Sequence, residues 1–365
     1  MNPVGIGIIG CGNISPAYLK AAAGFPILAI KGIADLNPAA AEARAAEFGL
    51  TARSIEALLA DPDIEIIVNL TIPKAHVEVG LLAIAAGKHV HSEKPLGTTV
   101  AQARPLLAAA KAKGLRVGCA PDTFLGGAHQ TCRKLIDEGA IGTPLAGTAF
   151  FMCPGHESWH PNPGFYYAAG GGPMLDMGPY YITDLVNLLG PVARVAGIAT
   201  QLRAERLITS EPLKGTTIPV EVATHVAGTL HFVSGATVSI AMSFDVPRHR
   251  HSCIELYGSE AAMIVPDPNF FGGEIEIAPP RGDWQAVETQ HAYADGNYRS
   301  IGVADMAHAI RGSRPHRANG DLAFHVLEVM EAFQRSSDEG RHIAIETRPE
   351  RPAMLPTNLR AGALD

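Results

Sequence analysis

Lys94 is the residue of this sequence whose position most directly predicts a catalytic role. It lies in the segment Ser92–Gly97, after a short apolar run that we predict to be a strand and before Pro95. The residue before a proline favours extended backbone, so Lys94 is expected in a loop at the carboxyl edge of a parallel sheet, where open α/β folds bind ligands. An ammonium group there can hold a substrate hydroxyl and stabilise a developing alkoxide. The alternative is a surface lysine paired with Glu93.

The turn Gly10–Ser15 has the pattern of a dinucleotide-binding loop. It follows an apolar run and opens a helix, where two glycines allow a pyrophosphate to approach the backbone. Ser15 stands where a third glycine or alanine is usual, which weakens the motif. Asp35 ends the next predicted strand, 23 residues after Gly12, where a carboxylate can accept the ribose hydroxyls and repel a 2′-phosphate. The sequence therefore predicts NAD, with NADP less favoured. The residues expected to bind it are Gly10, Gly12, Asn13, Ile14 and Asp35.

A second chemical segment begins with three glycines, 170–172, ahead of a predicted helix. Asp176 and Tyr180 are four residues apart in that helix and therefore share a face. We predict that Tyr180 exchanges the proton of the reacting hydroxyl and that Asp176 orients the substrate or Lys94. A tyrosine with a pKa of about 10 is too weak a base at neutral pH, so we expect Lys94 and a nicotinamide cation to lower that pKa. Tyr180 could instead be a core aromatic, with Tyr181 its main rival for the catalytic role.

The string His156-Glu-Ser-Trp-His160 matches a zinc-protease motif, which binds metal only on a helix. Pro161 disfavours helical backbone at His160, so we predict no metal site. The aromatic and short polar side chains of this segment suit the apolar faces and hydroxyls of sugar rings, although a surface or subunit-contact loop is an equal alternative. The side chains expected to contact substrate are Lys94, Asp122, His156, Trp159, His160, Tyr167, Tyr180, Tyr181 and Asp184.

Two patterns of elements must position these residues in an α/β protein. Residues 1–122 alternate apolar runs with helical segments, which predicts a parallel sheet covered on both faces and hence a Rossmann NAD-binding domain. Residues 123–345 carry β-branched segments of alternating polarity, such as 237–242, which predict an α+β domain with a mainly antiparallel sheet that has one more polar face. Residues 346–365 are predicted to be an extended arm.

Composition argues against several classes of protein. The 365 residues are 47% hydrophobic with a formal net charge of −7, and their scattered Lys and Arg argue against a nucleic-acid partner. No apolar stretch approaches the ~20 residues of a membrane span, and the first positive residue, Lys20, is too late for a signal peptide. Five cysteines without a Cys-x-x-Cys spacing suit reduced thiols, and we predict a cytoplasmic protein.

The motifs occur together in one order, which resembles that of the Gfo/Idh/MocA family, the glucose–fructose oxidoreductase and inositol dehydrogenase group. They are Gly10-x-Gly12, Asp35, Thr71-x-Pro73-x-x-His76, Glu93-Lys94-Pro95, and three glycines followed by Asp176-x-Gly178. The resemblance spans nearly the whole chain. It implies that Lys94 lies in the catalytic site. It also implies that residues 123–345 bind substrate and form a large, mainly antiparallel open sheet that serves oligomerisation and builds a homodimer or homotetramer. We also expect Thr71, Pro73, His76 and Glu93 beside the cofactor, with a purely structural cap as the alternative at His76.

This sequence departs from the family pattern at two positions of the proposed chemistry. The family usually has a histidine four residues after the aspartate of the glycine-rich helix, where this chain has Tyr180; some relatives, such as glucose–fructose oxidoreductase, similarly carry tyrosine. The family also has a second aspartate three residues after that histidine, where this chain has Thr183, with Asp184 one residue further on. We therefore predict an NAD-dependent oxidoreductase that transfers hydride to or from a secondary alcohol or ketone of a sugar, glycoside or cyclitol. Two alternatives remain, an NAD-recycling glycoside hydrolase of the same fold and a non-catalytic NAD-binding regulator.

Overall fold

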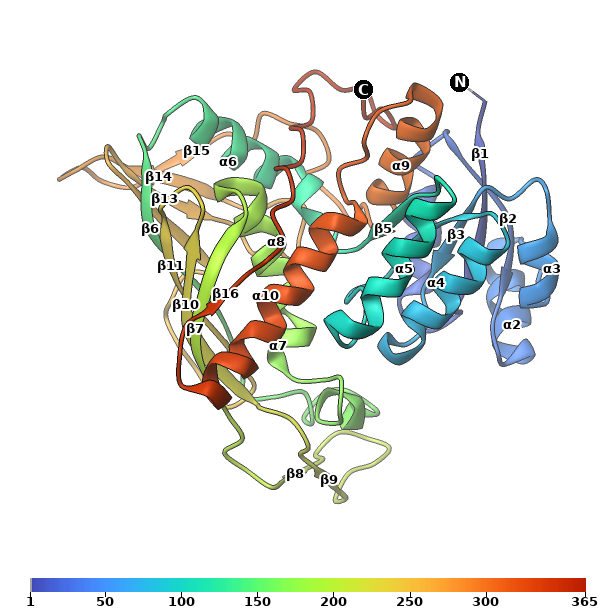
Figure 1. Ribbon diagram of the computed structural model, residues 1–365, viewed down its shortest axis with the longest axis horizontal. Coiled ribbons are helices and arrows are strands. Elements are labelled where there is room, and N and C mark those ends of the chain that lie inside the picture. The colour runs from blue at the N-terminus through green and yellow to red at the C-terminus, as the bar shows by residue number, and fades with distance from the viewer. Residues whose placement is uncertain (1) are drawn as a thin grey trace.

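The computed structural model, which describes residues 2–365, contains two large sheets with helices between them (Figure 1). The N-terminal sheet has five parallel strands in the order β2-β1-β3-β4-β5, which confirms the predicted Rossmann architecture. Its strands are β1 (Val4–Ile9), β2 (Leu28–Ala34), β3 (Ile66–Asn69), β4 (His89–Ser92) and β5 (Val117–Cys119).

Helices on both faces explain why the strands at the centre of this sheet are mainly apolar. All six residues of β1 are buried, and no polar side chain interrupts it. The connecting helices are α1 (Ser15–Ala22), α2 (Pro38–Phe48), α3 (Ile55–Ala60), α4 (His76–Ala85) and α5 (Val100–Ala112), with the short turn η1 (Pro73–Ala75) ahead of α4. Because all five strands run parallel, their carboxyl ends form one edge, and the loops after them lie along it.

The C-terminal sheet has nine strands in the order β15-β14-β13-β12-β6-β11-β10-β7-β16. All pairs are antiparallel except β6 with β11, as the mainly antiparallel prediction requires. The strands are β6 (Pro144–Met152), β7 (Val192–Thr200), β10 (His225–Phe232), β11 (Thr237–Ser243), β12 (Ile254–Gly258), β13 (Ala262–Val265), β14 (Ile275–Ala278), β15 (Gln285–Val287) and β16 (Ile343–Ala344).

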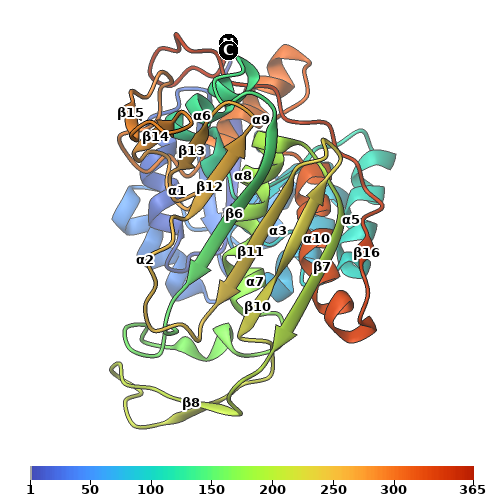
Figure 2. The ribbon, with the colours of Figure 1, turned by 90° about the vertical axis from the view of Figure 1, so that its left-hand side faces the viewer.

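One face of this sheet is covered by helices and the other is open, as Figure 2 shows. The difference is visible in β11, where Thr237 and Ser239 are exposed while Val238 and Ile240 are buried. The remaining elements are η2 (Thr123–Leu125), α6 (Gly127–Asp137), η3 (Pro163–Tyr166), α7 (Pro173–Asp176), α8 (Gly178–Leu189), β8 (Glu205–Leu207), β9 (Thr217–Pro219), α9 (Ile301–Gly312) and α10 (Gly320–Glu339).

Two helices, α8 and α9, pack where the two sheets meet. Every residue of α8 is buried, because it packs between α10, α6 and the end of the Rossmann sheet. The chain from 301 to 312, although late in the sequence, forms α9 against β5 and α1. Thus the C-terminal part of the chain reaches back to the cofactor side. None of the helices in residues 2–365 is both long and apolar enough to cross a lipid bilayer.

Candidate active site

Lys94 lies directly after β4, at the carboxyl edge of the Rossmann sheet, and it links this edge to α7. Its Nζ donates to the main-chain oxygen of Asp176 at 2.6 Å and to Oδ1 of the same residue at 2.8 Å. Only 16% of the side chain is exposed, so Lys94 is not the surface lysine of the alternative interpretation. A lysine ammonium has three donors. Within residues 2–365, Asp176 takes two of them and no acceptor takes the third.

The charges of this pair support each other. Burial opposes the charged form of Lys94, but the carboxylate of Asp176, aided by Tyr180 and Glu93, raises the pKa of the ammonium above its ordinary value. Burial likewise opposes a charged Asp176, but Lys94 and His156 hold the pKa of that carboxyl down to about 2. At neutral pH the two side chains are therefore a charged pair with one ammonium donor to spare.

Tyr180 faces Lys94 from the first turn of α8. The Nζ of Lys94 lies 5.1 Å from the centre of the phenol ring, and Nη2 of Arg299 lies 3.4 Å from the phenol oxygen. The helix that we predicted through Asp176 and Tyr180 is in fact two helices, α7 and α8, which meet at Met177. The side chains of both residues still lie next to Lys94, that of Asp176 through its carboxylate and that of Tyr180 through its ring.

Lys94 does act to lower the pKa of Tyr180, as predicted, but in the chain without cofactor the net shift of this pKa is upward. Burial raises this pKa most, and the negative charge of Glu93 raises it further. Lys94 and Arg299 lower it, but by less than burial and Glu93 raise it. The reason is that the phenol lies in the interior between the two domains, where a phenolate is poorly solvated. Tyr180 is therefore a neutral phenol in this structure, and so a proton donor.

The structure separates Tyr180 from its rival. Tyr181 points to another side of α8, where its ring packs edge-on against Phe151 with centres 6.4 Å apart, and it is 1% exposed. Asp184 is fully buried and Oδ2 lies 2.8 Å from Nδ1 of His129. Neither residue reaches Lys94, so the structure does not bring these two predicted substrate contacts to the site.

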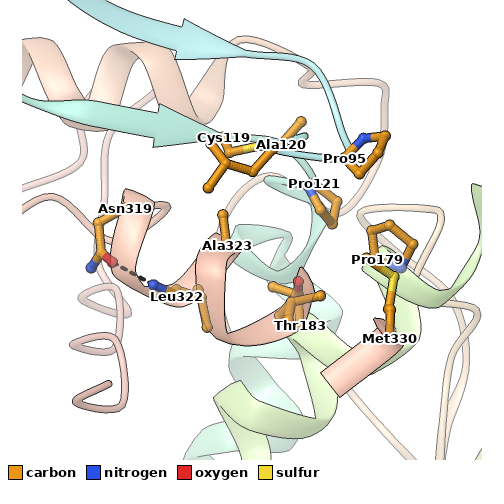
Figure 3. Close-up of a pocket in the computed structure, with 12 residues that line it drawn as sticks. Pro95, Cys119, Ala120, Pro121, Pro179, Thr183, Asn319, Leu322, Ala323 and Met330 are labelled. Atoms are coloured by element: carbon orange, nitrogen blue, oxygen red, sulfur yellow. Dashed lines mark hydrogen bonds between the residues drawn. The ribbon is translucent and has the colours of Figure 1, made fainter. Parts of the chain in front are cut away.

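The space under the Lys94 loop is apolar packing. Figure 3 shows a small pocket between the ends of β4 and β5 and the helices α8 and α10. Pro95, the residue after Lys94, and Pro179, the residue before Tyr180, both line it, together with Met330 of α10. The apolar neighbours of Lys94 and Tyr180 thus pack in one pocket, which helps to fix the two reactive side chains relative to each other.

Two further predicted contacts hold loops together. Asp122, 1% exposed, accepts hydrogen bonds from the backbone N–H groups of Ser300 at 3.3 Å and Gly302 at 2.9 Å. Tyr167 is fully buried and donates its hydroxyl to Glu157. Both polar groups are satisfied within the fold, away from any open surface.

The histidine segment does form one wall of the site. His156 is buried with Nε2 3.7 Å from Oδ2 of Asp176, and its ring packs on Tyr166 at 4.1 Å. Trp159 stands beside it, 61% exposed, with the ring of His160 next in line at 5.3 Å. Residues 156–160 contain a turn and no helix, which agrees with the expectation of non-helical backbone there. Residues 2–365 contain no group of three or more His, Cys, Asp or Glu side chains placed to hold a metal ion.

The cofactor loop has the geometry that a dinucleotide requires. A side chain at Gly10, where φ is +107°, would meet the backbone of Leu70 at 2.5 Å, whereas the space above Gly12 is open. The N–H groups of Gly12, Asn13 and Ile14 donate to no other part of residues 2–365, so they are available to a phosphate.

Asp35 lies at the carboxyl end of β2, as predicted. Its two oxygens accept the N–H groups of Cys11 and Asn37, each at 2.8 Å, which fixes the carboxylate next to the loop. A groove of about 380 Å³ beside it, lined in part by Pro38, Arg53 and Ile55, is of a size that suits a bound small molecule. Loop, carboxylate and groove together fit NAD.

The other predicted cofactor residues connect loops along the sheet edge. His76 is buried, with Nδ1 2.7 Å from the main-chain oxygen of Pro95 and Nε2 3.0 Å from that of Thr71, which favours the structural alternative. Glu93 accepts the hydroxyl of Tyr18 at 2.7 Å and so ties α1 to the Lys94 loop. Pro73 begins the short turn η1 after β3.

Sequence reasoning missed Arg299, which contacts Tyr180. Tyr166, which packs on His156, belongs to the aromatic segment expected to suit a sugar ring, but the sequence favoured its neighbour as the substrate contact. Arg299 lies 119 positions from Tyr180 and belongs to no motif. Tyr166 is adjacent to the predicted Tyr167, and only the turn η3 decides which of the two faces the site.

Comparisons with known proteins agree with this geometry. The family model described as "Oxidoreductase family, NAD-binding Rossmann fold" (GFO_IDH_MocA) matches residues 4–120, and the GFO/IDH/MocA C-terminal domain matches residues 129–264. The dTDP-3,4-didehydro-2,6-dideoxy-alpha-D-glucose 3-reductase of Streptomyces violaceoruber is 33% identical over 352 residues, which cover 91% of this chain and 95% of that protein. The inositol 2-dehydrogenase of Rhizobium meliloti is 26% identical over 349 residues, which cover 94% of this chain and 99% of that protein.

A solved structure has the same fold. Levoglucosan dehydrogenase in complex with NADH and L-sorbose superposes with a TM-score of 0.83 at 23% sequence identity, over 95% of this chain and 100% of that one. At this identity the likeness concerns the fold.

Proposed function

Because the chain belongs to the Gfo/Idh/MocA family of oxidoreductases and carries its NAD-binding Rossmann domain, we propose that it transfers hydride between NAD and a secondary alcohol or ketone of a sugar, glycoside or cyclitol. The relatives support this substrate class, since their names are those of enzymes acting on a deoxysugar nucleotide, an inositol and levoglucosan. The observation that carries the proposal is the Lys94–Asp176 pair beside Tyr180 at the carboxyl edge of the cofactor-binding sheet.

In this proposal Lys94 binds and polarises the reacting oxygen. Asp176 holds the ammonium by two hydrogen bonds, so the remaining N–H has a fixed direction. A donor that is already oriented and charged stabilises the alkoxide without reorganising during the reaction. NAD, when bound, supplies the hydride acceptor in oxidation and the hydride donor, as NADH, in reduction.

Tyr180 exchanges the proton of the reacting hydroxyl in place of the usual family histidine. Its neutral phenol can give a proton to an alkoxide in the direction of reduction. In the direction of oxidation it must first lose that proton, and the charges of Lys94 and Arg299 favour its loss. His156, Trp159 and Tyr166 form the aromatic wall against which a sugar ring would pack.

We expect Tyr180→Phe to lower kcat by about 10²-fold, the lower end of the usual contribution of a general acid or base. The ring and its packing remain, so binding of NADH should be unchanged. Tyr181→Phe is the matched control and should keep wild-type turnover. Both are measured by NADH absorbance with the best substrate from a panel of sugars, glycosides and cyclitols. Wild-type turnover in Tyr180→Phe would refute the assignment.

The same panel tests the reaction class. Oxidation coupled to stoichiometric NADH supports the proposal. Glycoside cleavage without net NADH would instead indicate a hydrolase that recycles bound NAD, and no turnover on any substrate would indicate a regulator.

We further propose that Asp35 selects NAD over NADP. Asp35→Ser should weaken NADH binding by about tenfold or more, because a hydrogen bond to a charged group contributes ~1.5–3 kcal/mol. It should strengthen NADPH binding, since Nη2 of Arg44 lies 3.5 Å from the main-chain oxygen of Gly12 and no carboxylate would then repel a 2′-phosphate. Fluorescence titrations with both reduced cofactors measure this. Equal losses for the two cofactors would contradict it.

We also propose the division into a cofactor domain (1–122), a substrate and oligomerisation domain (123–345) and an extended arm (346–365), in a cytoplasmic homodimer or homotetramer. Support for the oligomer comes from the open face of the nine-stranded sheet, on which Ile198 of β7 is 65% exposed. Light scattering during size-exclusion chromatography tests the assembly, and a monomer would overturn it.

A further inference from the structure

Arg299 lies over the phenol oxygen of Tyr180 and comes from a distant part of the chain. It lies just before α9 and so follows Tyr180 in the sequence, whereas Lys94 precedes Tyr180. Its Nη2 is 3.4 Å from the oxygen of Tyr180 and 3.0 Å from Oδ1 of Asn269. The guanidinium therefore spans the phenol and a neutral amide.

The backbone beside Arg299 is held in an uncommon conformation. Ser300 has φ of +134° and ψ of −3°, a region that residues with a side chain rarely adopt. Its N–H bonds Asp122 and its hydroxyl donates to the main-chain oxygen of Tyr18 at 3.0 Å. Tyr18 in turn bonds Glu93, the neighbour of Lys94. The cofactor domain thus fixes the position of Arg299 relative to Tyr180.

The charges around the phenol come from three elements. Lys94 and Glu93 face it from the loop after β4, and Arg299 faces it from the segment before α9. Asp176 of α7 acts on Lys94, with which it is paired, and Tyr166 of η3 is the nearby titratable phenol. Arg299 forms no ion pair with a carboxylate in residues 2–365, whereas the charge of Lys94 is offset by Asp176 at 2.8 Å.

We propose that Arg299 is a positioning residue that contacts the oxygen of Tyr180, while Lys94 lies over the ring, and that it sets the pH range in which Tyr180 exchanges a proton with the substrate. The inference rests on the proposed role of Tyr180. Arg299 acts through that residue, whose phenol oxygen it contacts at 3.4 Å. In oxidation the substrate O–H bond breaks and its proton moves to the phenolate oxygen, while the hydride leaves to NAD; in reduction both transfers reverse.

The sign of the effect follows from the charges. A cation near the phenol favours phenolate, so removal of Arg299 raises the pKa of Tyr180 further. In oxidation Tyr180 acts as the base, and the rising limb of the pH–rate profile should then move to higher pH. We expect a shift of about one pH unit for Arg299→Met, which means about tenfold slower oxidation at pH values below the limb. Arg299→Lys should move the limb less.

The decisive experiment compares kcat–pH profiles of the full-length wild type, Arg299→Met, Arg299→Lys, Tyr180→Phe and the double variant Tyr180→Phe/Arg299→Met. If Arg299 acts through Tyr180, the double variant is no slower than Tyr180→Phe alone. Thermal unfolding and the NADH dissociation constant identify a variant that is merely misfolded, in which case Arg299→Lys carries the comparison.

Two outcomes would overturn the inference. One is an unshifted limb in Arg299→Met, and the other is an additive loss in the double variant. Either would leave the proposed function intact as long as Tyr180→Phe is slow. If Tyr180→Phe itself has wild-type turnover, the proposed role of Tyr180 fails first, and the two failures are therefore distinguishable.

Discussion

Lys94→Met is expected to lower kcat/KM for the sugar or cyclitol substrate by about 10³-fold, while NADH binding stays close to that of the wild type. Loss of a single oriented donor in an oxyanion site costs about 10²–10³-fold in rate. Lys94 supplies both the donor and the full positive charge next to the reacting oxygen, so the upper end of this range applies. Methionine keeps the apolar stem that packs beside Pro95 and removes only the ammonium.

Removal of Lys94 also changes the pKa of its partner, Asp176. Burial alone would raise the pKa of this carboxyl, and it is the ammonium of Lys94 that chiefly holds the pKa at about 2. Without Lys94 the pKa of Asp176 rises, and the stability that its lowered pKa gives the wild type, which is lost only as the pH falls through about 2, is no longer supplied by this pair. The matched control is Lys111→Met on the exposed face of α5, which should keep wild-type kinetics. A Lys94→Met enzyme within about tenfold of wild type would contradict a catalytic role.

The cofactor half could be read from the sequence because its signals are local. The apolar runs that become β1 to β5 and the glycines at 10 and 12 each act within a few residues. The position of Lys94 also followed from a strand and a proline next to it. Motifs such as these reflect constraints on the backbone of one turn or loop. The residues that meet such a constraint are adjacent in the sequence and can be recognised there.

The substrate half could be read only in part, because its polar residues have distant partners. Asp184 was expected in the site because it lies one residue beyond the place of the family's second aspartate, but it is paired with His129, 55 positions away. Asp122 is likewise matched by backbone 180 positions later. A buried polar group with a partner and a functional one look alike in sequence, and only the packing of α8 and α9 tells them apart.

The choice between Tyr180 and Tyr181 shows the same limit on a smaller scale. Successive residues of a helix point about 100° apart, so the start of α8 at Gly178 decides which ring meets Lys94. Sequence periodicity predicted one helix through this region, and the break at Met177 could not be seen in it. Arg299 could not be predicted at all, because what marks its position is the unusual backbone of Ser300, and a conformation of this kind is not visible in the sequence.

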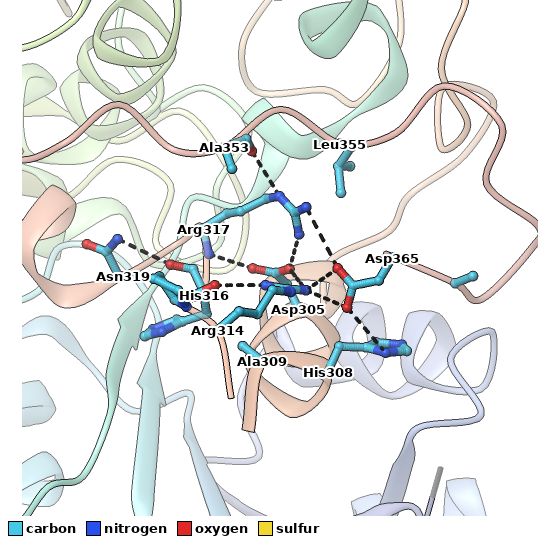
Figure 4. A network of polar contacts seen from close by, with 12 residues as sticks. Asp305, His308, Ala309, Arg314, His316, Arg317, Asn319, Ala353, Leu355 and Asp365 are labelled. Carbon is cyan, nitrogen blue, oxygen red and sulfur yellow. Dashed lines mark hydrogen bonds and ion pairs between the residues drawn. The ribbon is translucent and has the colours of Figure 1, made fainter. Parts of the chain in front are cut away.

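A second large effect concerns stability, at the buried carboxylate of Asp305 in α9. Figure 4 shows this side chain between Arg314 and Arg317. Asp305 has no exposed surface; it accepts from Nη2 of Arg314 at 2.8 Å and from the main-chain N–H of Arg317 at 2.5 Å, and it pairs with the guanidinium of Arg317. The carboxylate of Asp365 contacts the same Nη2 of Arg314, also at 2.8 Å. One buried acid thus connects α9 to the loop ahead of α10 and, through Arg314, to the C-terminal arm.

Asp305→Ala should therefore lower the free energy of unfolding by about 3–5 kcal/mol, the usual cost of removing one partner from a buried ion pair. Arg317 is 7% exposed and would keep its charge without the carboxylate that balances it, and the backbone N–H of the same residue would lose its acceptor. Urea unfolding followed by circular dichroism measures the loss. Asp338→Ala, an exposed carboxylate near the end of α10, is the control and should change stability by no more than about 0.5 kcal/mol. Since α9 begins directly after Arg299 and Ser300, an Asp305→Ala protein as stable as the wild type would also mean that this network does not hold the helix that positions them.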